Sequence, residues 1–142
     1  MHFPREIGLK RTFCDNPAAF RQYVSKMWDK TACYTSLYGF SERKWNGRRM
    51  VFDYQTAIID RAWWDFDVAT GRGFHIHQIF KVPVREDRWP TELVRYEKAM
   101  ADGLPTLDCI GTVDRLCRIP GTYNPKRKRF AVVIDAQRFA AD

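Results

Sequence analysis

Residues 61–77 read RAWWDFDVATGRGFHIH, and this stretch decides the fold expected for the chain. An apolar run ends in Asp65 and Asp67, a Gly-Arg-Gly turn follows, and a second strand-like run carries His75 and His77. Side chains alternate between the two faces of a strand, so the members of each pair should share a face. A tight turn between two such runs is typical of an antiparallel hairpin. The stretch therefore predicts two carboxylates and two imidazoles lining one cleft.

The remaining segments predict an α+β fold around this hairpin. The hairpin is joined too tightly for a parallel crossover, so we expect a mixed or antiparallel sheet with helices on one face. Asn16 or Asp15 caps a helix expected over about 16–30, and Gly103 ends a second helix that begins near 91. We expect strands near 32–38, 104–110 and 129–136, a basic turn at 41–49, a strand or short helix at 50–59, and a helical turn at 112–119.

The composition indicates one globular domain of 142 residues with a substantial core. No apolar run approaches the ~20 residues of a membrane span, and no signal peptide is visible, so we expect an intracellular, cytoplasmic protein. The four cysteines form no C-x-x-C pair, which gives no indication of zinc. We expect the four cysteines to be buried as small apolar side chains: Cys14, Cys33, Cys109 and Cys117. We also expect five larger side chains in the core: Tyr23, Met27, Trp28, Trp63 and Trp64.

A net charge of +7 favours a polyanionic partner, of which nucleic acid is the commonest. The excess is concentrated in two clusters rather than spread along the chain. Trp45 lies within the first cluster and is the best candidate for stacking on a template base. The clusters are Arg43, Lys44, Arg48 and Arg49, and then Arg115, Arg118 and the run PKRKR that ends in Arg129.

The paired carboxylates predict a metal site. Two carboxylates as close as Asp65 and Asp67 repel each other, and a divalent cation removes that cost. Oxygen ligands suit Mg²⁺ or Mn²⁺. Such an ion can bridge triphosphate oxygens and activate an attacking hydroxyl, so the hairpin predicts metal-dependent phosphate chemistry.

Several motifs resemble those of the archaeo-eukaryotic primase superfamily, nearest to archaeal and to viral or plasmid primase-polymerase catalytic domains. WWDFD at 63–67 resembles the family's Asp-hydrophobic-Asp motif, and TGRGFHIH at 70–77 resembles its Ser-Gly-Arg turn followed by an aromatic residue and a histidine. LD at 107–108 with RLCRIPGTYNPK at 115–126 resembles the third motif. CYTSLYGF at 33–40 is similar to the strand that precedes the active site in archaeal primases.

The resemblance implies a DNA primase or primase-polymerase with an RRM-like, palm-type sheet. Such an enzyme transfers nucleotides from dNTPs or NTPs to a 3′-hydroxyl on a single-stranded DNA template. It also implies a helicase or an accessory priming module as a partner, and a virus or plasmid as the source. The chain would form one domain, with an N-terminal part over about 1–60 and a catalytic part over about 61–142.

The resemblance further implies a role for each matching residue. Asp65, Asp67 and Asp108 would hold two Mg²⁺ or Mn²⁺ ions, and His75 would contact the triphosphate. His77 would either support the site or be structural. Asn124 stands where the family has histidine, and Asp114 is the alternative to Asp108 as third carboxylate. The other nucleotide contacts would be Thr70, Gly71, Arg72, Gly73, Arg118, Asn124 and Lys126, and the template backbone would meet Arg127, Lys128 and Arg129.

Two other classes of protein fit parts of this pattern. A replication-initiator nuclease uses a His-hydrophobic-His metal site and a tyrosine nucleophile, which His75, His77 and Tyr96 would supply. A non-catalytic RRM-like module would need the basic and aromatic residues but not the carboxylates.

Overall fold

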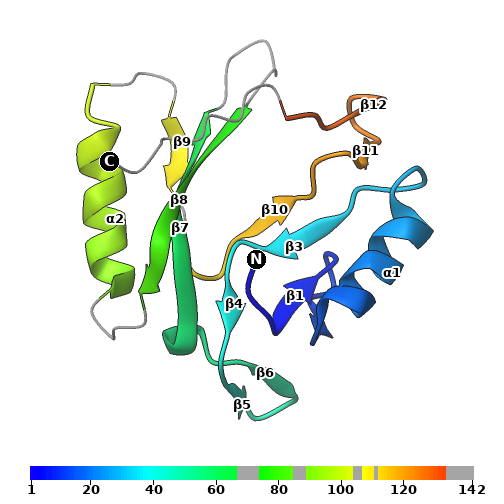
Figure 1. Ribbon diagram of the computed structural model, residues 1–142, viewed down its shortest axis with the longest axis horizontal. Coiled ribbons are helices and arrows are strands. Elements are labelled where there is room, and N and C mark those ends of the chain that lie inside the picture. The colour runs from blue at the N-terminus through cyan, green and yellow to red at the C-terminus, as the bar shows by residue number, and fades with distance from the viewer. Residues whose placement is uncertain (67–73, 85–88, 104–106, 111, 134–142) are drawn as a thin grey trace.

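The computed structural model describes residues 1–66, 74–84, 89–103, 107–110 and 112–133, with the backbone alone for 84, 89–90 and 107–110. These residues form an α+β fold in which every strand pairing is antiparallel, as expected. The expectation of one sheet with helices on one face is wrong, because the strands form two main sheets and each α-helix lies beside a different one (Figure 1). The elements are β1 Arg5–Ile7, β2 Thr12–Cys14, α1 Pro17–Met27, β3 Tyr34–Ser36, β4 Gly39–Phe40, β5 Arg43–Trp45, β6 Met50–Phe52, the 3₁₀ helix η1 Tyr54–Thr56, β7 Ala57–Phe66, β8 Phe74–Val84, α2 Trp89–Met100, β9 Leu107–Ile110, β10 Leu116–Arg118, β11 Tyr123–Asn124 and β12 Arg129–Phe130.

Two four-stranded sheets lie between the two α-helices of the described residues (Figure 1). One sheet has the order β10-β3-β1-β2 and lies beside α1. The other has the order β4-β7-β8, with β9 also paired to β7, and lies beside α2. The consecutive strands β3 and β4 connect the sheets, while β5–β6 and β11–β12 form separate hairpins. The long strand β7 is therefore central to its sheet.

Both edges of β7 are occupied. One edge pairs with β8, and the other pairs with β4 at its start and with β9 at its end. Between those two short partners, the backbone N–H of Trp63 donates to Glu97 Oε1 of α2 at 2.8 Å. The indole Nε1 of Trp64 donates to the Glu97 carbonyl at 2.9 Å. A buried glutamate thus supplies an acceptor on β7 between the residues that β4 and β9 pair with.

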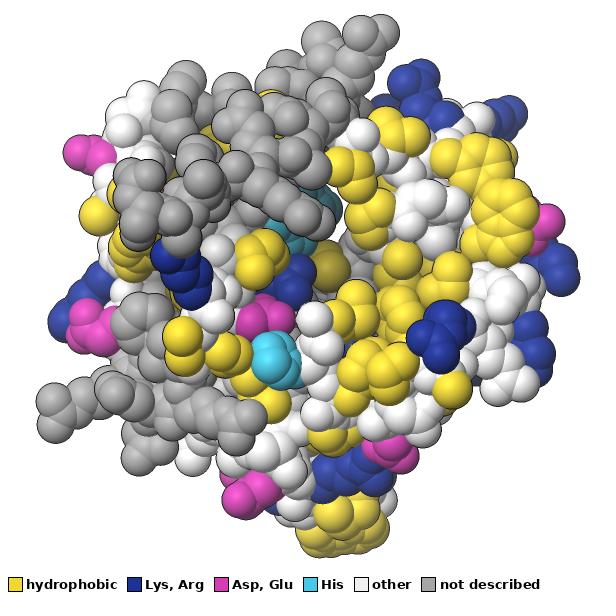
Figure 2. Space-filling view, in the orientation of Figure 1, with side chains coloured by type: hydrophobic (Ala, Val, Ile, Leu, Met, Phe, Trp, Pro, Cys, Tyr) yellow, Lys and Arg dark blue, Asp and Glu magenta, His cyan; other side chains and the backbone are white. Residues whose placement is uncertain are grey.

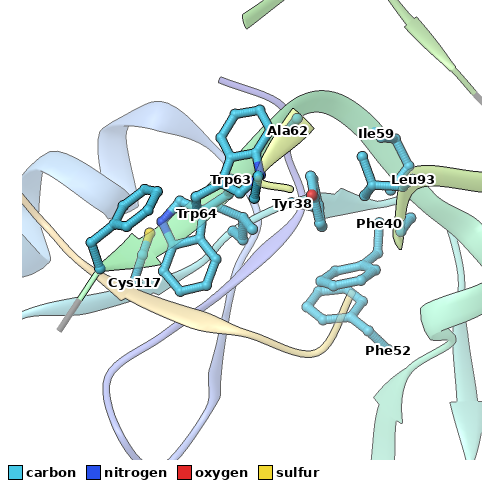
Figure 3. Close-up of a cluster of buried hydrophobic side chains, with 13 residues drawn as sticks. Tyr38, Phe40, Phe52, Ile59, Ala62, Trp63, Trp64, Leu93 and Cys117 are labelled. Carbon is cyan, nitrogen blue, oxygen red and sulfur yellow. The ribbon is translucent and has the colours of Figure 1, made fainter. Parts of the chain in front are cut away.

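The hydrophobic core is formed around the tryptophans of β7 (Figure 3). Trp63 and Trp64 are 2% and 6% exposed, which confirms that they are core residues. Leu93 of α2 packs into the same cluster, as does Cys117 of β10. The core therefore joins both sheets and α2.

Trp28 was expected in this core, and that prediction is wrong because the side chain is 44% exposed. It follows the last residue of α1 and packs on Phe130 of β12, with 5.5 Å between ring centroids. Periodicity in the helix could not predict this, since Phe130 is far away in the chain.

Other local predictions are mostly confirmed. Asn16 caps α1 through a bond from the Ala19 N–H to Oδ1 at 2.9 Å, and Gly103 adopts a positive φ of 76° after α2. The helical turn expected at 112–119 is wrong, because Leu116–Arg118 forms β10 and pairs with β3. The expected last strand is shorter than 129–136: β12 ends at Phe130, and 134–136 lie outside the described residues.

Cys14, Cys33 and Cys117 are buried with free thiols, as expected. Burial raises the pKa of each thiol, so none is an activated nucleophile at neutral pH. The side chain of Cys109 lies outside the described atoms. None of the described helices is both long and apolar enough to cross a membrane.

The Glu97 contact predicts a large effect on stability. Glu97→Ala should lower the free energy of unfolding by about 2–3 kcal/mol, because the buried Trp63 N–H loses its acceptor. Glu97→Gln should recover most of that loss through its amide oxygen. Urea unfolding followed by circular dichroism measures both.

Glu92→Ala is the control. Because Glu92 pairs with Arg95 in solvent, its substitution should change the free energy of unfolding by less than about 0.5 kcal/mol. Equal losses for both alanine variants would contradict the anchoring role of Glu97.

Candidate functional site

Asp65 and His75 meet directly across the β7–β8 hairpin. They are register partners, and His75 Nε2 lies 3.2 Å from Asp65 Oδ1. Both side chains are partly exposed, at 23% for Asp65 and 34% for His75, so the pair is accessible from solvent. The predicted hairpin face thus exists for the residues that are described, with Trp63 opposite His77 next along it.

Strand β9 brings the backbone of Asp108, the third predicted carboxylate residue, close to Asp65 on β7. Asp65 pairs with Cys109 and Phe66 pairs with Leu107, so Asp108 is the extra residue of a β-bulge between those pairs. Bulges of this kind are common next to active sites, where they change the direction of a side chain. Asp65 is therefore flanked by His75 on β8 and, on β9, by the backbone near Asp108.

Asp114, the alternative third carboxylate, lies in the turn between β9 and β10. Its Oδ1 accepts the Thr112 hydroxyl at 2.6 Å, and its carbonyl accepts from Arg11 Nη2 at 2.7 Å. These bonds give Asp114 a role in the turn, while the register of β9 places Asp108 beside Asp65.

Part of the predicted site lies outside the described residues: Asp67, Thr70, Gly71, Arg72 and Gly73. The side chain of Asp108 is likewise not described. Within the described part of the chain, no group of three or more His, Cys, Asp or Glu side chains is placed to hold a metal ion. Of the expected ligands, the described side chains include Asp65 alone.

His77 shares the face of Asp65 and His75 but differs from them in its surroundings. The Trp63 indole meets its ring edge-on, with 6.4 Å between centroids. The residue as a whole is exposed, but desolvation of its ring, followed by the positive charge of Arg61, lowers the pKa of His77 to about 4. His77 is therefore neutral at physiological pH and adds no charge to the site.

Arg61 is held on this face by a bidentate ion pair with Asp60. Arg61 Nε and Nη2 lie 2.7 and 3.0 Å from the Asp60 carboxylate oxygens. Burial alone would raise the pKa of Asp60, but the pair with Arg61 lowers it below its ordinary value. Figure 2 shows histidine, basic and acidic side chains close together near the middle of this face of the molecule.

The residues expected at the phosphates lie on β10 and the β11–β12 hairpin. Arg118 Nη2 donates to the Tyr34 hydroxyl at 3.0 Å, and its guanidinium lies 5.1 Å from the centre of the Tyr34 ring. Its buried Nη1 has no hydrogen-bond partner among the described residues. Asn124 Oδ1 accepts the Lys126 N–H at 3.2 Å, so its side-chain oxygen shapes the turn and its amide NH₂ is the group that can donate.

The first basic cluster forms the β5–β6 hairpin, where Trp45 is 63% exposed. Arg43 forms an ion pair with Asp15, and Lys44 Nζ lies 2.9 Å from Asp53. The hairpin connects through η1 to the start of β7, whereas Asp65 is near the end of that strand. Ten residues of strand span about 30 Å. This hairpin, with the predicted contacts Arg43, Lys44, Trp45, Arg48 and Arg49, therefore lies at the opposite end of the molecule from Asp65 (Figure 1).

Tyr96 is placed on the other side of the sheet from the two histidines. Its ring contacts Trp64 and Phe80, and its hydroxyl donates to Gln78 Oε1 at 2.7 Å. Trp64 and Gln78 alternate with Asp65 and His77, so they occupy the opposite face. Tyr96 and the His-hydrophobic-His pair therefore do not share a site.

Three structural contributors to the site were not predicted from sequence: Tyr34, Glu97 and the bulge at Asp108. The segment 33–40 resembles the strand that precedes the active site in archaeal primases, but that resemblance does not predict the bond between Tyr34 and Arg118. No sequence signal identifies the other two, because each depends on pairing between distant segments.

Comparison of the chain with protein-family models, with curated proteins and with solved structures finds no match.

The lowered pKa of His77 predicts pH-dependent stability. Well above pH 6.5, the ordinary histidine value, His77 is neutral in both states and its contribution to stability does not change with pH. As the pH falls from 6.5 to about 4, the unfolded chain takes up a proton that the folded chain does not, so stability decreases. His77→Gln should reduce this slope in urea unfolding, and the His77 ring should titrate below pH 5 by NMR. Titration of His77 at its ordinary value would contradict the assignment.

Proposed function

We propose that the chain is a metal-dependent nucleotidyltransferase of the primase or primase-polymerase type, with β7, β8 and β9 acting as a palm-type sheet. The single observation that carries the proposal is the position of Asp65 on the central strand. It lies between His75 on β8 and the backbone of Asp108 on β9. Two of the segments that carry primase-like motifs, β7 with β8 and the later strand β9, are thus neighbours in the sheet, which supports the proposal.

The proposed chemistry follows from the residue types. Two Mg²⁺ or Mn²⁺ ions would be held by Asp65, Asp67 and Asp108, and would lower the pKa of an attacking 3′-hydroxyl while neutralising triphosphate charge. His75 can orient Asp65 through the 3.2 Å contact, and its ring is exposed enough to reach a bound triphosphate. The substrates would be dNTPs or NTPs on a single-stranded DNA template.

The opposing sheet would supply positive charge for the phosphates. Arg118 is held by its bond to Tyr34, and the residue is partly exposed, so its guanidinium would be the group that contacts a phosphate. Arginine offers a planar fork suited to phosphate oxygens, and Lys126 offers a point charge. The glycine turn at 70–73 would bind phosphate through backbone N–H groups.

The nuclease alternative is disfavoured by the position of Tyr96. A tyrosine nucleophile must reach the phosphate bound at the metal, but Tyr96 lies across the sheet from His75 and His77. Tyr96→Phe should therefore leave nucleotidyl transfer intact.

A non-catalytic RRM-like module would present aromatic side chains on the sheet surface. Trp63 and Trp64 are buried, so they are unable to stack on bases, and Phe74 of β8 is the large aromatic side chain that this sheet exposes among the described residues. Such a module also gives no reason for the two aspartate residues, Asp65 and Asp108, on the adjacent strands β7 and β9.

Extension of a primed single-stranded DNA in the presence of dNTPs or NTPs and Mn²⁺ or Mg²⁺ tests the proposal. Asp65→Asn and Asp108→Asn should each reduce the rate by about 10²–10³-fold or more, because each removes charge that stabilises the transition state. Asp114→Asn is the matched control and should stay within about threefold of the native rate, because its carboxylate serves the turn. Unchanged rates for the first two variants, or no activity in the native protein, would contradict the proposal.

A further inference from the structure

An exposed aromatic cluster joins the end of α1 to the β11–β12 hairpin. Trp28 and Phe130 are each 44% exposed, and their rings meet at 5.5 Å with an interplanar angle of 33°. Tyr123 packs edge-on against Phe130, also at 5.5 Å. The Tyr123 N–H donates to the Trp28 carbonyl at 2.7 Å, which anchors the hairpin to the helix. We call these three residues the Trp28 platform.

The surroundings of the platform are strongly positive. Residues 115–133 contain six Lys or Arg and no Asp or Glu. Lys126, Arg127, Lys128 and Arg129 at the hairpin are exposed, and none forms an ion pair with a described residue. By contrast, two cations of β5–β6 are neutralised by Asp15 and Asp53. Figure 2 shows the basic side chains of the β11–β12 region beside exposed hydrophobic ones.

We propose that the Trp28 platform and the four cations beside it bind single-stranded DNA. Bases would stack on Trp28 and Phe130, while Lys126 to Arg129 would contact the phosphates. Exposed aromatic rings within a positive surface are the recognised chemistry of single-strand binding, because unpaired bases offer their faces and duplex bases do not. The choice of DNA over RNA rests on the proposed function, whereas the stacking surface itself does not.

The position of the platform suits a template that enters the proposed site. Figure 1 shows β11 and β12 at the same end of the molecule as the end of β7, where Asp65 lies, and β5–β6 at the other end. Arg118 on β10 precedes the hairpin directly in the chain. Single-stranded DNA bound on the Trp28 platform would therefore lie at the same end of the molecule as Asp65. DNA bound at Trp45 would lie at the opposite end.

The hairpin turn offers a charge-removing variant that does not harm folding. Lys128 has a φ of 51°, a left-handed conformation that favours glycine. Lys128→Gly should therefore remove a charge without destabilising the turn. Similarly, Trp28→Ala removes the indole but keeps the carbonyl that anchors Tyr123.

The test is fluorescence anisotropy of a labelled mixed-sequence single strand with the full chain, in EDTA and without nucleotide. Trp28→Ala should weaken binding about 5- to 150-fold, and Trp28→Phe should restore most of it, because stacking contributes about 1–3 kcal/mol per base. Lys128→Gly should weaken binding and reduce the salt slope by about 0.7. Lys10→Ala, in the β1–β2 turn, is the control for general charge. Thermal unfolding checks that each variant is folded.

Unchanged binding of DNA by folded Trp28→Ala would overturn the proposal. A loss of binding confined to Trp45→Ala would also overturn it, because it would assign stacking to the β5–β6 hairpin. Tighter binding to duplex DNA or to RNA of the same sequence would overturn the choice of single-stranded DNA. Because no metal is present, failure of the platform is separable from failure of catalysis. If Asp65→Asn binds normally and the native protein transfers no nucleotide, the platform stands and the proposed function falls.

Discussion

The pairing of β7 on both of its edges is the constraint on which the rest of the structure depends. β8 occupies one edge, while β4, Glu97 and β9 occupy the other in succession. A central strand with its polar backbone satisfied can bury Trp63 and Trp64 on its two faces. It can also hold Asp65 near its end, at the margin of the core, where a charged group still reaches solvent.

This arrangement gathers the residues of the proposed sites at one end of the molecule. At the end of β7, Asp65 meets His75 and the bulge at Asp108, and the β11–β12 hairpin brings cations and aromatic rings to the same end (Figure 1). The exposed hairpin β5–β6 lies at the other end, with part of its charge neutralised. The proposed metal site and the proposed template surface therefore lie at the same end of the molecule.

Sequence patterns predicted what depends on neighbouring residues. Alternation in 61–77 predicted the hairpin that places Asp65 opposite His75, and Asn16 with Pro17 predicted the start of α1. The failures depend on distant partners. Residues 116–118 become a strand because β3 offers an edge, and Trp28 leaves the core because Phe130 packs on it. The bulge at Asp108 and the role of Glu97 arise only when β9 and α2 meet β7, so no local pattern contained them.

The central claim is that carboxylates from β7 and β9 converge on divalent metal. The most direct measurement is a crystal structure of the protein soaked with Mn²⁺, with the ions located by their anomalous scattering. The account predicts Mn²⁺ bound by Asp65 and Asp108 together, with metal–oxygen distances of about 2.0–2.6 Å. Ordered carboxylates of Asp65 and Asp108 that hold no Mn²⁺ between them, with ions bound elsewhere or not at all, would contradict it.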